Sequence, residues 1–583
     1  MEDILLQVNK PARYIGEEWN VSRKDFQGAG IKFALCFPDL YEVGMSNLGI
    51  RIIYGVLNSM PDITCERFFS CGPDLEKILR SNSVEILSLE SKKALKDFDI
   101  IGFSLGSELD YTNVLNILDL GNIPLRSEGR DNAYPLVIAG GPCALNPEPM
   151  HEFFDLFLIG EAEDFLLEFI EAYRTQKTDY RTFKISKQDL LFSFSKLEGV
   201  YVPQLYEVSY DLEGKISEFR VKKEGAPPKI KKRFVKNFDS SFFPKDWLVP
   251  YIQTIHDRVT IEIMRGCPNS CSFCQARSQY YPLRVRSIEN ILSLAKTSLE
   301  RTGYEEVSLS GLSVSDYPKV ENLIRELIAA FKANCVSLSL PSIKAKAQIG
   351  ELSAMLSQIK KTGLTFAPEA GSQRLRNILR KDFDETEFFQ MLAGSYGCGY
   401  QHVKLYFMIG IPSENREDLD GIINLSLQVS ELRKKVKNIS AQVNISVNAL
   451  IPKPHTSFQW FAMEAEENIR KKQGYLKDKA RNRRLKLNFH NPNMSFLEAV
   501  LSRGDRRLAR VVSLAFEKGA RFDAWGNYFN FEFWSDAFKE SGLDPNFYLK
   551  ERARDDIFPW DFIDTGIDKK LMLEEFNKII DTL

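Results

Sequence analysis

The sequence predicts an α/β protein with two successive series of parallel strands and helices, followed by a mostly helical C-terminal region. Short apolar runs of strand length recur along residues 1–175 and again from residue 259, with helical patterns between them. Strands that are apolar on both faces and alternate with helices indicate parallel sheets covered on both sides. The last hundred residues consist of helical patterns rich in aromatic residues, and we expect this aromatic core to pack onto the second series.

The first series contains five strand-length runs, at residues 32–37, 63–69, 99–106, 134–141 and 155–161. Five such units predict a flavodoxin-like, doubly wound domain, in which ligands bind beyond the carboxyl ends of the strands. Small or polar residues stand at those ends: Ser104, Gly106, Gly140, Gly141, Gly160 and Glu161. Because glycine lets the backbone approach a bulky ligand closely, these positions are candidates for a binding site.

The second series contains six runs, at residues 259–266, 305–311, 336–343, 364–370, 402–410 and 445–454. Six consecutive strand–helix units predict a partial (β/α)6 barrel with its chemistry at the carboxyl ends of the strands. We therefore expect four regions: a ligand-binding domain, a connecting region, the barrel and the helical region, at residues 1–175, 176–250, 251–485 and 486–583.

Three of the nine cysteines lie within eight positions, in "RGCPNSCSFC" (265–274), directly after the first barrel strand. Cys267, Cys271 and Cys274 supply one thiolate fewer than a closed zinc site or a fully Cys-ligated iron–sulfur cluster normally uses. An open coordination position suits a [4Fe–4S] cluster whose fourth iron binds another ligand. A zinc site and three unrelated cysteines are the alternatives.

The spacing Cys-x-x-x-Cys-x-x-Cys, with Phe273 before the last cysteine, resembles the radical S-adenosylmethionine (SAM) superfamily. The resemblance implies a [4Fe–4S] cluster on the three cysteines, with the amino and carboxylate groups of SAM on the unique iron. An electron from a donor such as flavodoxin or ferredoxin would cleave SAM into methionine and a 5′-deoxyadenosyl radical, which abstracts hydrogen.

Segments after the later strands resemble SAM-binding segments of the same superfamily. "SLSGLSVSDY" (308–317) takes the place of the methionine-binding motif, and "SLPSIKA" (339–345) and "TFAPEAGSQRLRN" (365–377) take the places of ribose or carboxylate contacts. "KLYFMIGIPSE" (404–414) matches the strand beside adenine. The resemblance therefore assigns SAM binding to Phe273, Gly311, Ser313, Ser339, Ser342, Glu369, Gly410 and Glu414, and it assigns no catalytic side chain.

The first domain resembles the B12-binding domains that precede certain radical enzymes. The resemblance rests on "IIGFSLGSELD" (100–110), "VIAGGPCALNPEP" (137–149) and "DLFLIGEAEDFL" (155–166). It implies a cobalamin site lined by Ser104, Gly140, Gly141 and Gly160. The chain has no Asp-x-His-x-x-Gly segment, so it offers no histidine to cobalt. A scaffold that binds another ligand, or none, is the alternative.

The whole chain resembles an uncharacterised family of radical SAM proteins with an N-terminal B12-binding domain, as residues 10–20, 503–526 and 558–567 show. Cobalamin beside a radical generator suits methyl transfer to an unactivated carbon, which is the predicted reaction. Cyclisation or rearrangement without methyl transfer is the second hypothesis. A methylthiotransferase-like modification of RNA or protein would need an auxiliary cluster on Cys36, Cys65, Cys71 and Cys143.

An iron–sulfur RNA-binding module is a hypothesis from a different class. Residues 470–487 hold nine Lys or Arg residues, and residues 502–510 add four arginines. Such stripes can follow phosphates, although a charge run is more often a solvated helix face. RNA or a ribosomal component therefore stays open as a substrate.

The bulk composition is that of a soluble protein. The 583 residues are 44% hydrophobic and 27% charged, with a formal net charge of −2. No apolar stretch approaches the roughly 20 residues that span a bilayer, and the first ten residues do not form a signal peptide. We therefore expect a cytoplasmic protein with reduced thiols and no membrane partner.

Overall fold

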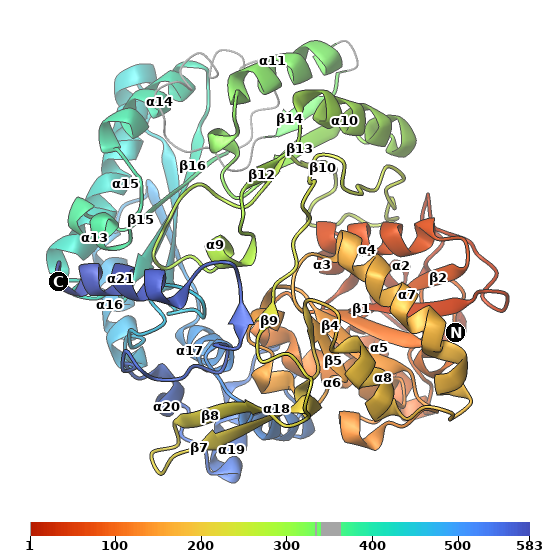
Figure 1. The fold of residues 1–583 in the computed structure, drawn as a ribbon. Coiled ribbons are helices and arrows are strands. Elements are labelled where there is room, and N and C mark those ends of the chain that lie inside the picture. Colours follow the sequence, from red (N-terminus) through yellow and green to blue (C-terminus); the bar gives the residue numbers. More distant parts are fainter. Residues whose placement is uncertain (1, 333–334, 340–362) are drawn as a thin grey trace.

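A computed structural model of the chain describes residues 2–332, 335–339 and 363–583. The predicted fold class is confirmed: an N-terminal parallel sheet, a second series of parallel strands with helices outside them, and a C-terminal helical region (Figure 1). None of the described helices is long and apolar enough to cross a membrane.

The N-terminal sheet has the strand order β2-β1-β3-β4-β5-β6. All neighbouring pairs are parallel except β5 and β6. The order of the first five strands is that of the flavodoxin-like fold, in which the connections change direction between β1 and β3 and leave a crevice at the carboxyl ends. The six strands are β1 (Ile31–Phe37), β2 (Ile63–Phe69), β3 (Ile100–Ser104), β4 (Leu136–Gly140), β5 (Leu156–Leu158) and β6 (Val200–Tyr201).

Helices pack on both faces of this sheet, because its strands are apolar on both faces; six of the seven residues of β1 are buried. Asn47 caps the first long helix by accepting a hydrogen bond from the N–H of Ile50. The helices are α4 (Leu48–Ser59), α5 (Pro73–Asn82), α6 (Tyr111–Leu120), α7 (Ala162–Arg181) and α8 (Lys187–Phe194).

The second series forms two sheets of parallel strands, with orders β10-β13-β14 and β15-β16-β17-β18. Along β16 and β17 the residues that face the covering helices are buried and apolar, whereas alternate residues are less buried and mostly polar, as the period of a strand requires. The strands are β10 (Val259–Glu262), β13 (Glu306–Ser310), β14 (Ser337–Ser339), β15 (Leu364–Glu369), β16 (His402–Ile409), β17 (Gln442–Ala449) and β18 (Leu485–Phe489). The main helices are α10 (Ile288–Thr302), α11 (Val320–Phe331), α14 (Glu385–Gly397), α15 (Arg416–Lys437) and α16 (Glu466–Lys479).

Three details of this region differ from the sequence prediction. The first predicted strand, 259–266, ends at Glu262, and Met264–Arg265 form a separate short strand in an antiparallel pair. β17 begins at Gln442, three residues before the predicted start. β18 was not predicted; it adds a seventh parallel strand beside β17. The alternation in "LKLNF" is a strand pattern of only five residues, and it lies at the end of a basic stretch that dominates the local composition.

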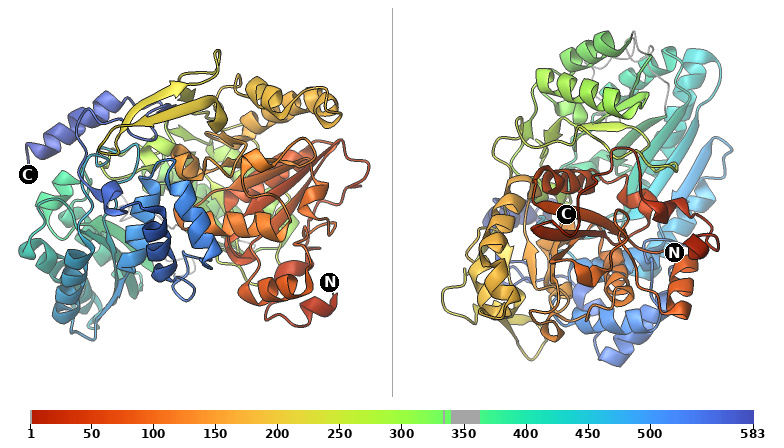
Figure 2. Two further views of the ribbon diagram at one scale, coloured as in Figure 1. Left: turned by 90° about the horizontal axis from the view of Figure 1, so that it is seen from below. Right: turned by 90° about the vertical axis from the view of Figure 1, so that its right-hand side faces the viewer.

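Three C-terminal helices, which include the aromatic segment, pack mainly on the N-terminal domain, so the expectation that this segment packs onto the barrel is wrong. Trp534 and Phe538 are buried in the same apolar core as the N-terminal sheet, and Trp525 donates a hydrogen bond to Asp39 (2.8 Å). These three helices are α17 (Pro492–Ser502), α18 (Leu508–Glu517) and α19 (Phe531–Ser541). The last helix, α21 (Lys569–Ile580), packs instead with barrel residues such as Ile411. The left view of Figure 2 shows the other blue C-terminal helices against the orange part of the N-terminal domain, with the last helix, at the C label, away from it.

Candidate functional site

The three clustered cysteines lie on a loop whose ends are joined by a short antiparallel ribbon. β11 (Met264–Arg265) pairs with β12 (Arg284–Val285), and the short helix α9 (Ala276–Gln279) follows the last cysteine. Gly266 begins the loop with φ +91°, and a Cβ there would lie 2.8 Å from the Cα of Leu283. Only glycine fits this turn without a shift of the backbone.

The three thiols are half-buried and close enough to influence one another. Burial raises the pKa of Cys271, Lys381 opposes this shift and the neighbouring thiols add to it, so that the pKa lies at about 11. Burial also raises the pKa of Cys274. Iron must therefore displace protons from these thiols when it binds.

The three thiols on one loop form a donor set of the kind that holds an iron–sulfur cluster. Among the described residues, no group of three or more His, Cys, Asp or Glu side chains could hold a metal ion. A [4Fe–4S] cluster needs its thiolates on different iron atoms. Asn269 Nδ2 donates to Cys267 Sγ (3.3 Å), which is the kind of hydrogen bond that tunes a cluster sulfur.

The same Asn269 links the cysteine loop to the predicted methionine-binding segment after β13. Its Nδ2 also donates to Asp316 (2.9 Å), and Asp316 accepts a hydrogen bond from the predicted residue Ser313 (2.7 Å). Gly311 lies against the start of the loop, since a Cβ there would be 2.7 Å from the Cγ of Met264. The structure thus brings Gly311 and Ser313 beside the cysteines.

Glu369 also lies near the thiols, because its charge affects the pKa values of Cys271 and Cys274. Its backbone has φ +69°, and its carboxylate pairs with Lys381 (3.2 Å). Burial raises the pKa of Glu369, and Lys381 opposes this shift. A carboxylate held at this strand end can accept hydrogen bonds from ribose hydroxyls.

The other predicted SAM residues have less direct placements. Glu414 accepts a hydrogen bond from the N–H of Gly410 (2.8 Å) and pairs with Lys472 (2.7 Å), so these contacts hold it within its own turn. Ser339 is buried at the end of β14, and Phe273 is half-buried against an apolar cluster that includes Trp460. Ser342 lies outside the described residues.

A cavity of about 460 Å³ lies between the N-terminal sheet and the barrel. All four predicted cobalamin residues, Ser104, Gly140, Gly141 and Gly160, line it. Glu262, Arg265 and Ser310 line it from the barrel side. No histidine is among its lining residues. The cavity therefore joins the carboxyl ends of strands from both regions.

The glycines leave space in this cavity that side chains would occupy. A Cβ on Gly106 would meet no heavy atom within 4 Å, and a Cβ on Gly140 would meet its nearest neighbour, the oxygen of Leu158, at 3.4 Å. Gly141 has φ +99° and lies so close to Leu105 that a Cβ would be 2.7 Å from its oxygen. The lining thus suits a bulky ligand that approaches the backbone closely.

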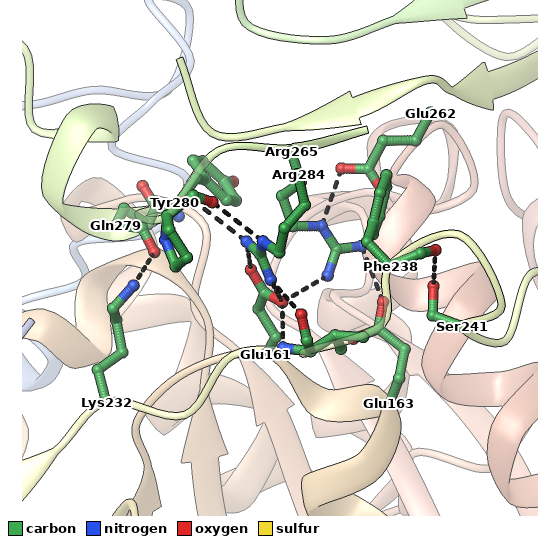
Figure 3. A network of polar contacts seen from close by, with 12 residues as sticks. Glu161, Glu163, Lys232, Phe238, Ser241, Glu262, Arg265, Gln279, Tyr280 and Arg284 are labelled. Atoms are coloured by element: carbon green, nitrogen blue, oxygen red, sulfur yellow. Dashed lines mark hydrogen bonds and ion pairs between the residues drawn. The ribbon is translucent and has the colours of Figure 1, made fainter. Parts of the chain in front are cut away.

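A buried network of charged side chains adjoins the cavity (Figure 3). Glu161, at the N-terminus of α7, pairs with both Arg265 (3.1 Å) and Arg284 (2.7 Å). Arg265 also pairs with Glu163 (2.8 Å) and Glu262 (2.7 Å). The sequence predicts Glu161 at a strand end. It does not predict the two arginine partners, because they lie more than one hundred residues away along the chain.

Lys232 lines the same cavity as this charged network. Its buried ammonium group leads to a pH-dependent prediction. Its ammonium donates to the backbone oxygens of Gln279 (3.0 Å) and Tyr281 (2.7 Å), and burial lowers its pKa to about 8. The unfolded chain, with the ordinary lysine pKa, binds this proton more tightly than the folded chain. The contribution of Lys232 to stability therefore increases as pH rises from about 8 to about 10.5.

We therefore expect the melting temperature of the wild type, relative to Lys232→Met, to increase between about pH 7 and about pH 9.5. Parallel thermal unfolding of both proteins across this range measures the difference. A difference that does not change with pH would contradict the prediction.

The C-terminal helix α21 is tied to the cysteine loop through Glu575. Its carboxylate pairs with Arg277 (2.8 Å) on α9 and with Arg380, and it accepts a hydrogen bond from Ser457 (2.5 Å). Burial alone would raise the pKa of Glu575, but the hydrogen bonds from Arg277 and Ser457 hold it below its usual range.

Glu575→Gln should lower the melting temperature by a few degrees and slow SAM cleavage several-fold. The substitution leaves two guanidinium groups without a counter-charge, at a cost of about 1–3 kcal/mol. Differential scanning calorimetry and the rate of 5′-deoxyadenosine release measure the two effects. Glu574→Gln, at an exposed position of the same helix, is the control; equal effects of both variants would refute the role of Glu575.

The four N-terminal cysteines are placed unfavourably for an auxiliary cluster. Cys36, Cys65, Cys71 and Cys143 are all buried, and burial raises the pKa of each thiol. The three loop cysteines, by contrast, are only half-buried.

Comparison with known proteins places this geometry in a family. Residues 49–203 match the model described as "Radical SAM proteins, N-terminal", and residues 261–426 match the model "Radical SAM superfamily". Two solved structures share 12% identity with the chain. They are TsrM from Kitasatospora setae, a radical SAM methyltransferase with cobalamin and a [4Fe–4S] cluster bound, and the cobalamin-dependent SAM radical enzyme OxsB. Their TM-scores are 0.45 and 0.46; the matches cover 71% and 95% of this chain, and 74% and 80% of theirs.

A sequence relative matches the chain at higher identity than these structures do. Uncharacterized protein MJ0966 of Methanocaldococcus jannaschii is 30% identical over 482 residues, which are 82% of this chain and 90% of that protein. Together with the two matched models, this relative shows that the chain belongs to the radical SAM superfamily, whose members are enzymes that use a [4Fe–4S] cluster and SAM.

Proposed function

We propose that the chain is a cobalamin-dependent radical SAM enzyme that transfers a methyl group to an unactivated carbon. One observation carries the proposal: a single cavity is lined by the carboxyl ends of the N-terminal strands and by Arg265, two residues before Cys267. Two reactive groups bound on the two sides of this cavity would face a common space.

The cluster is assigned to Cys267, Cys271 and Cys274, and SAM to the strand ends beside them. Asn269 holds Cys267 and Asp316 together, and Gly311 and Ser313, which lie beside the loop, would bind the methionine part of SAM. Glu369, fixed by Lys381, is the acceptor for ribose hydroxyls. Phe273, Ser339, Ser342, Gly410 and Glu414 complete the proposed SAM-binding set.

Cobalamin is assigned to the cavity, where Ser104 can donate a hydrogen bond and Gly140, Gly141 and Gly160 admit the ligand close to the backbone. When bound, cobalamin supplies the chemistry of a methyl carrier. On the side of the sheet, the cavity is lined by apolar residues such as Phe103, Ile138 and Leu158. These residues would keep water away from the methyl transfer.

The products of SAM test this proposal. We expect the reconstituted enzyme, supplied with SAM, dithionite, hydroxocobalamin and a small-molecule cell extract, to form S-adenosylhomocysteine and 5′-deoxyadenosine in a ratio near one. Each methyl group transferred consumes one SAM as methyl source and one as radical source. 5′-Deoxyadenosine without S-adenosylhomocysteine would refute methyl transfer and favour cyclisation or rearrangement.

The described contacts do not favour the RNA-binding module, because most residues of its basic stretch are already paired. Arg503 donates to backbone oxygens in the interior, and Arg506 pairs with Glu148. Six cations of residues 470–487 lie next to carboxylates: Arg470–Glu466, Lys471–Glu467, Lys472–Glu414, Lys479–Asp420, Arg481–Asp478 and Arg484–Glu431. Such pairs leave little free charge for phosphates.

A further inference from the structure

We infer that Arg265 and Arg284 are positioning residues that fasten the cysteine loop to the N-terminal domain and so fix the cluster relative to the cavity. The inference rests on the proposed assignment of the cluster to Cys267, Cys271 and Cys274. It concerns the chain's own contacts, which exist whether or not the cluster is loaded.

The two arginines occupy the base of the loop. In the ribbon formed by β11 and β12, Arg265 lies directly opposite Arg284. Like charges on directly opposite residues of two strands destabilise a ribbon. The pair therefore needs a carboxylate from elsewhere in the chain.

Glu161 of the N-terminal domain supplies this carboxylate. Arg284 donates to both of its carboxylate oxygens at 2.7 Å, and Arg265 lies 3.1 Å from Oε2 (Figure 3). The N–H of Val235 also donates to Oε2 (2.7 Å), which fixes the carboxylate. One carboxylate thus bridges the two strands that close the cysteine loop.

Arg265 has two further acidic partners, one from each side of the interface. Its Nη2 donates to Glu163 of α7 (2.8 Å) and to Glu262 of β10 (2.7 Å). The guanidinium group also lies 4.9 Å from the ring centroid of Phe238. A planar group with five donors can satisfy this arrangement, whereas a lysine ammonium cannot.

Burial protects these ion pairs from screening by salt. The side chains of Arg265 and Glu161 are each 7% exposed and that of Glu163 is 3% exposed, so salt screens their interactions little. Removal of one partner from such a set leaves an uncompensated buried charge, which is strongly destabilising locally. Loss of Arg265 should therefore release the loop rather than leave it in place.

The network lies between the two proposed sites. Glu161 directly follows Gly160, and Glu161, Glu262 and Arg265 themselves line the cavity. Arg265 is separated from Cys267 only by Gly266. A cluster that must meet its partners within about half an ångström requires this kind of support.

The test compares Arg265→Met with Arg265→Lys in the full chain. Hydrogen exchange of residues 266–283 reports loop order and needs no cluster. Iron content and the electron paramagnetic resonance (EPR) spectrum of the reduced cluster report its environment. We expect Arg265→Met to keep most of its iron, to exchange the loop amides about tenfold faster, and to give a broadened EPR signal; Arg265→Lys should lie between Arg265→Met and the wild type.

Arg174→Met is the matched control. Arg174 lies on the same helix α7 as Glu163, but its pair with Asp62 (3.1 Å) is at the surface and contributes little. If Arg265→Met does not fold, Glu161→Gln replaces it, with faster loop exchange as the expected result.

Wild-type loop exchange and an unchanged EPR signal in Arg265→Met would overturn the inference, as would equal changes in Arg174→Met. A wild type that binds no cluster would instead refute the proposed function. The comparison of loop exchange would still decide whether Arg265 fastens the loop.

Discussion

Cys271→Ala should abolish SAM cleavage, with 5′-deoxyadenosine reduced at least about hundredfold. The cluster depends on three thiolates, and no other cysteine of the described chain lies within the same loop. A cluster that has lost one ligand cannot keep its fourth iron available to SAM. Anaerobic reconstitution followed by chromatography of 5′-deoxyadenosine measures the loss.

Cys398→Ala is the control for this prediction. Cys398 follows α14, is half-buried like the loop cysteines, and lies outside the loop. It should retain wild-type cleavage and iron content. Cleavage that persists in Cys271→Ala, or that is lost equally in Cys398→Ala, would contradict the assignment of the cluster.

Gly106→Leu should abolish the retention of cobalamin while SAM cleavage continues. A Cβ at this position meets no protein atom within 4 Å, and the residue lines the cavity. The added side chain therefore fills ligand space without displacing the fold. Gel filtration with hydroxocobalamin, followed by absorbance of the protein fraction, should show at least about a tenfold loss of bound cobalamin.

Gly474→Leu provides a matched substitution on the exposed surface of α16, where a Cβ also meets nothing within 4 Å. It should retain cobalamin as the wild type does. Equal retention by Gly106→Leu and the wild type would show that cobalamin does not bind in this cavity.

The sequence was sufficient for those parts of the fold that depend on local periodicity. The five N-terminal strands and the six barrel strands lie close to their predicted positions, because apolar runs bounded by turn residues mark buried parallel strands. The cysteine loop was also predictable, since the spacing of its thiols is a local feature.

The choice of packing partner was not predictable from local patterns. Trp534 and Phe538 have the composition of a core segment, yet nothing in their spacing indicates that they pack with the N-terminal sheet. The contacts of Glu161 with Arg265 and Arg284 likewise join residues more than one hundred positions apart. Such contacts are decided by tertiary structure, in which isolated charged residues find buried partners.

The central claim is that three cysteines hold a cluster with one iron open to SAM. EPR spectroscopy of the reduced, reconstituted wild type, with and without SAM, tests it most directly. We expect a [4Fe–4S] signal that shifts when SAM is added, because SAM becomes a ligand of the fourth iron. A signal that SAM leaves unchanged, or a protein that binds zinc and no iron, would contradict the account.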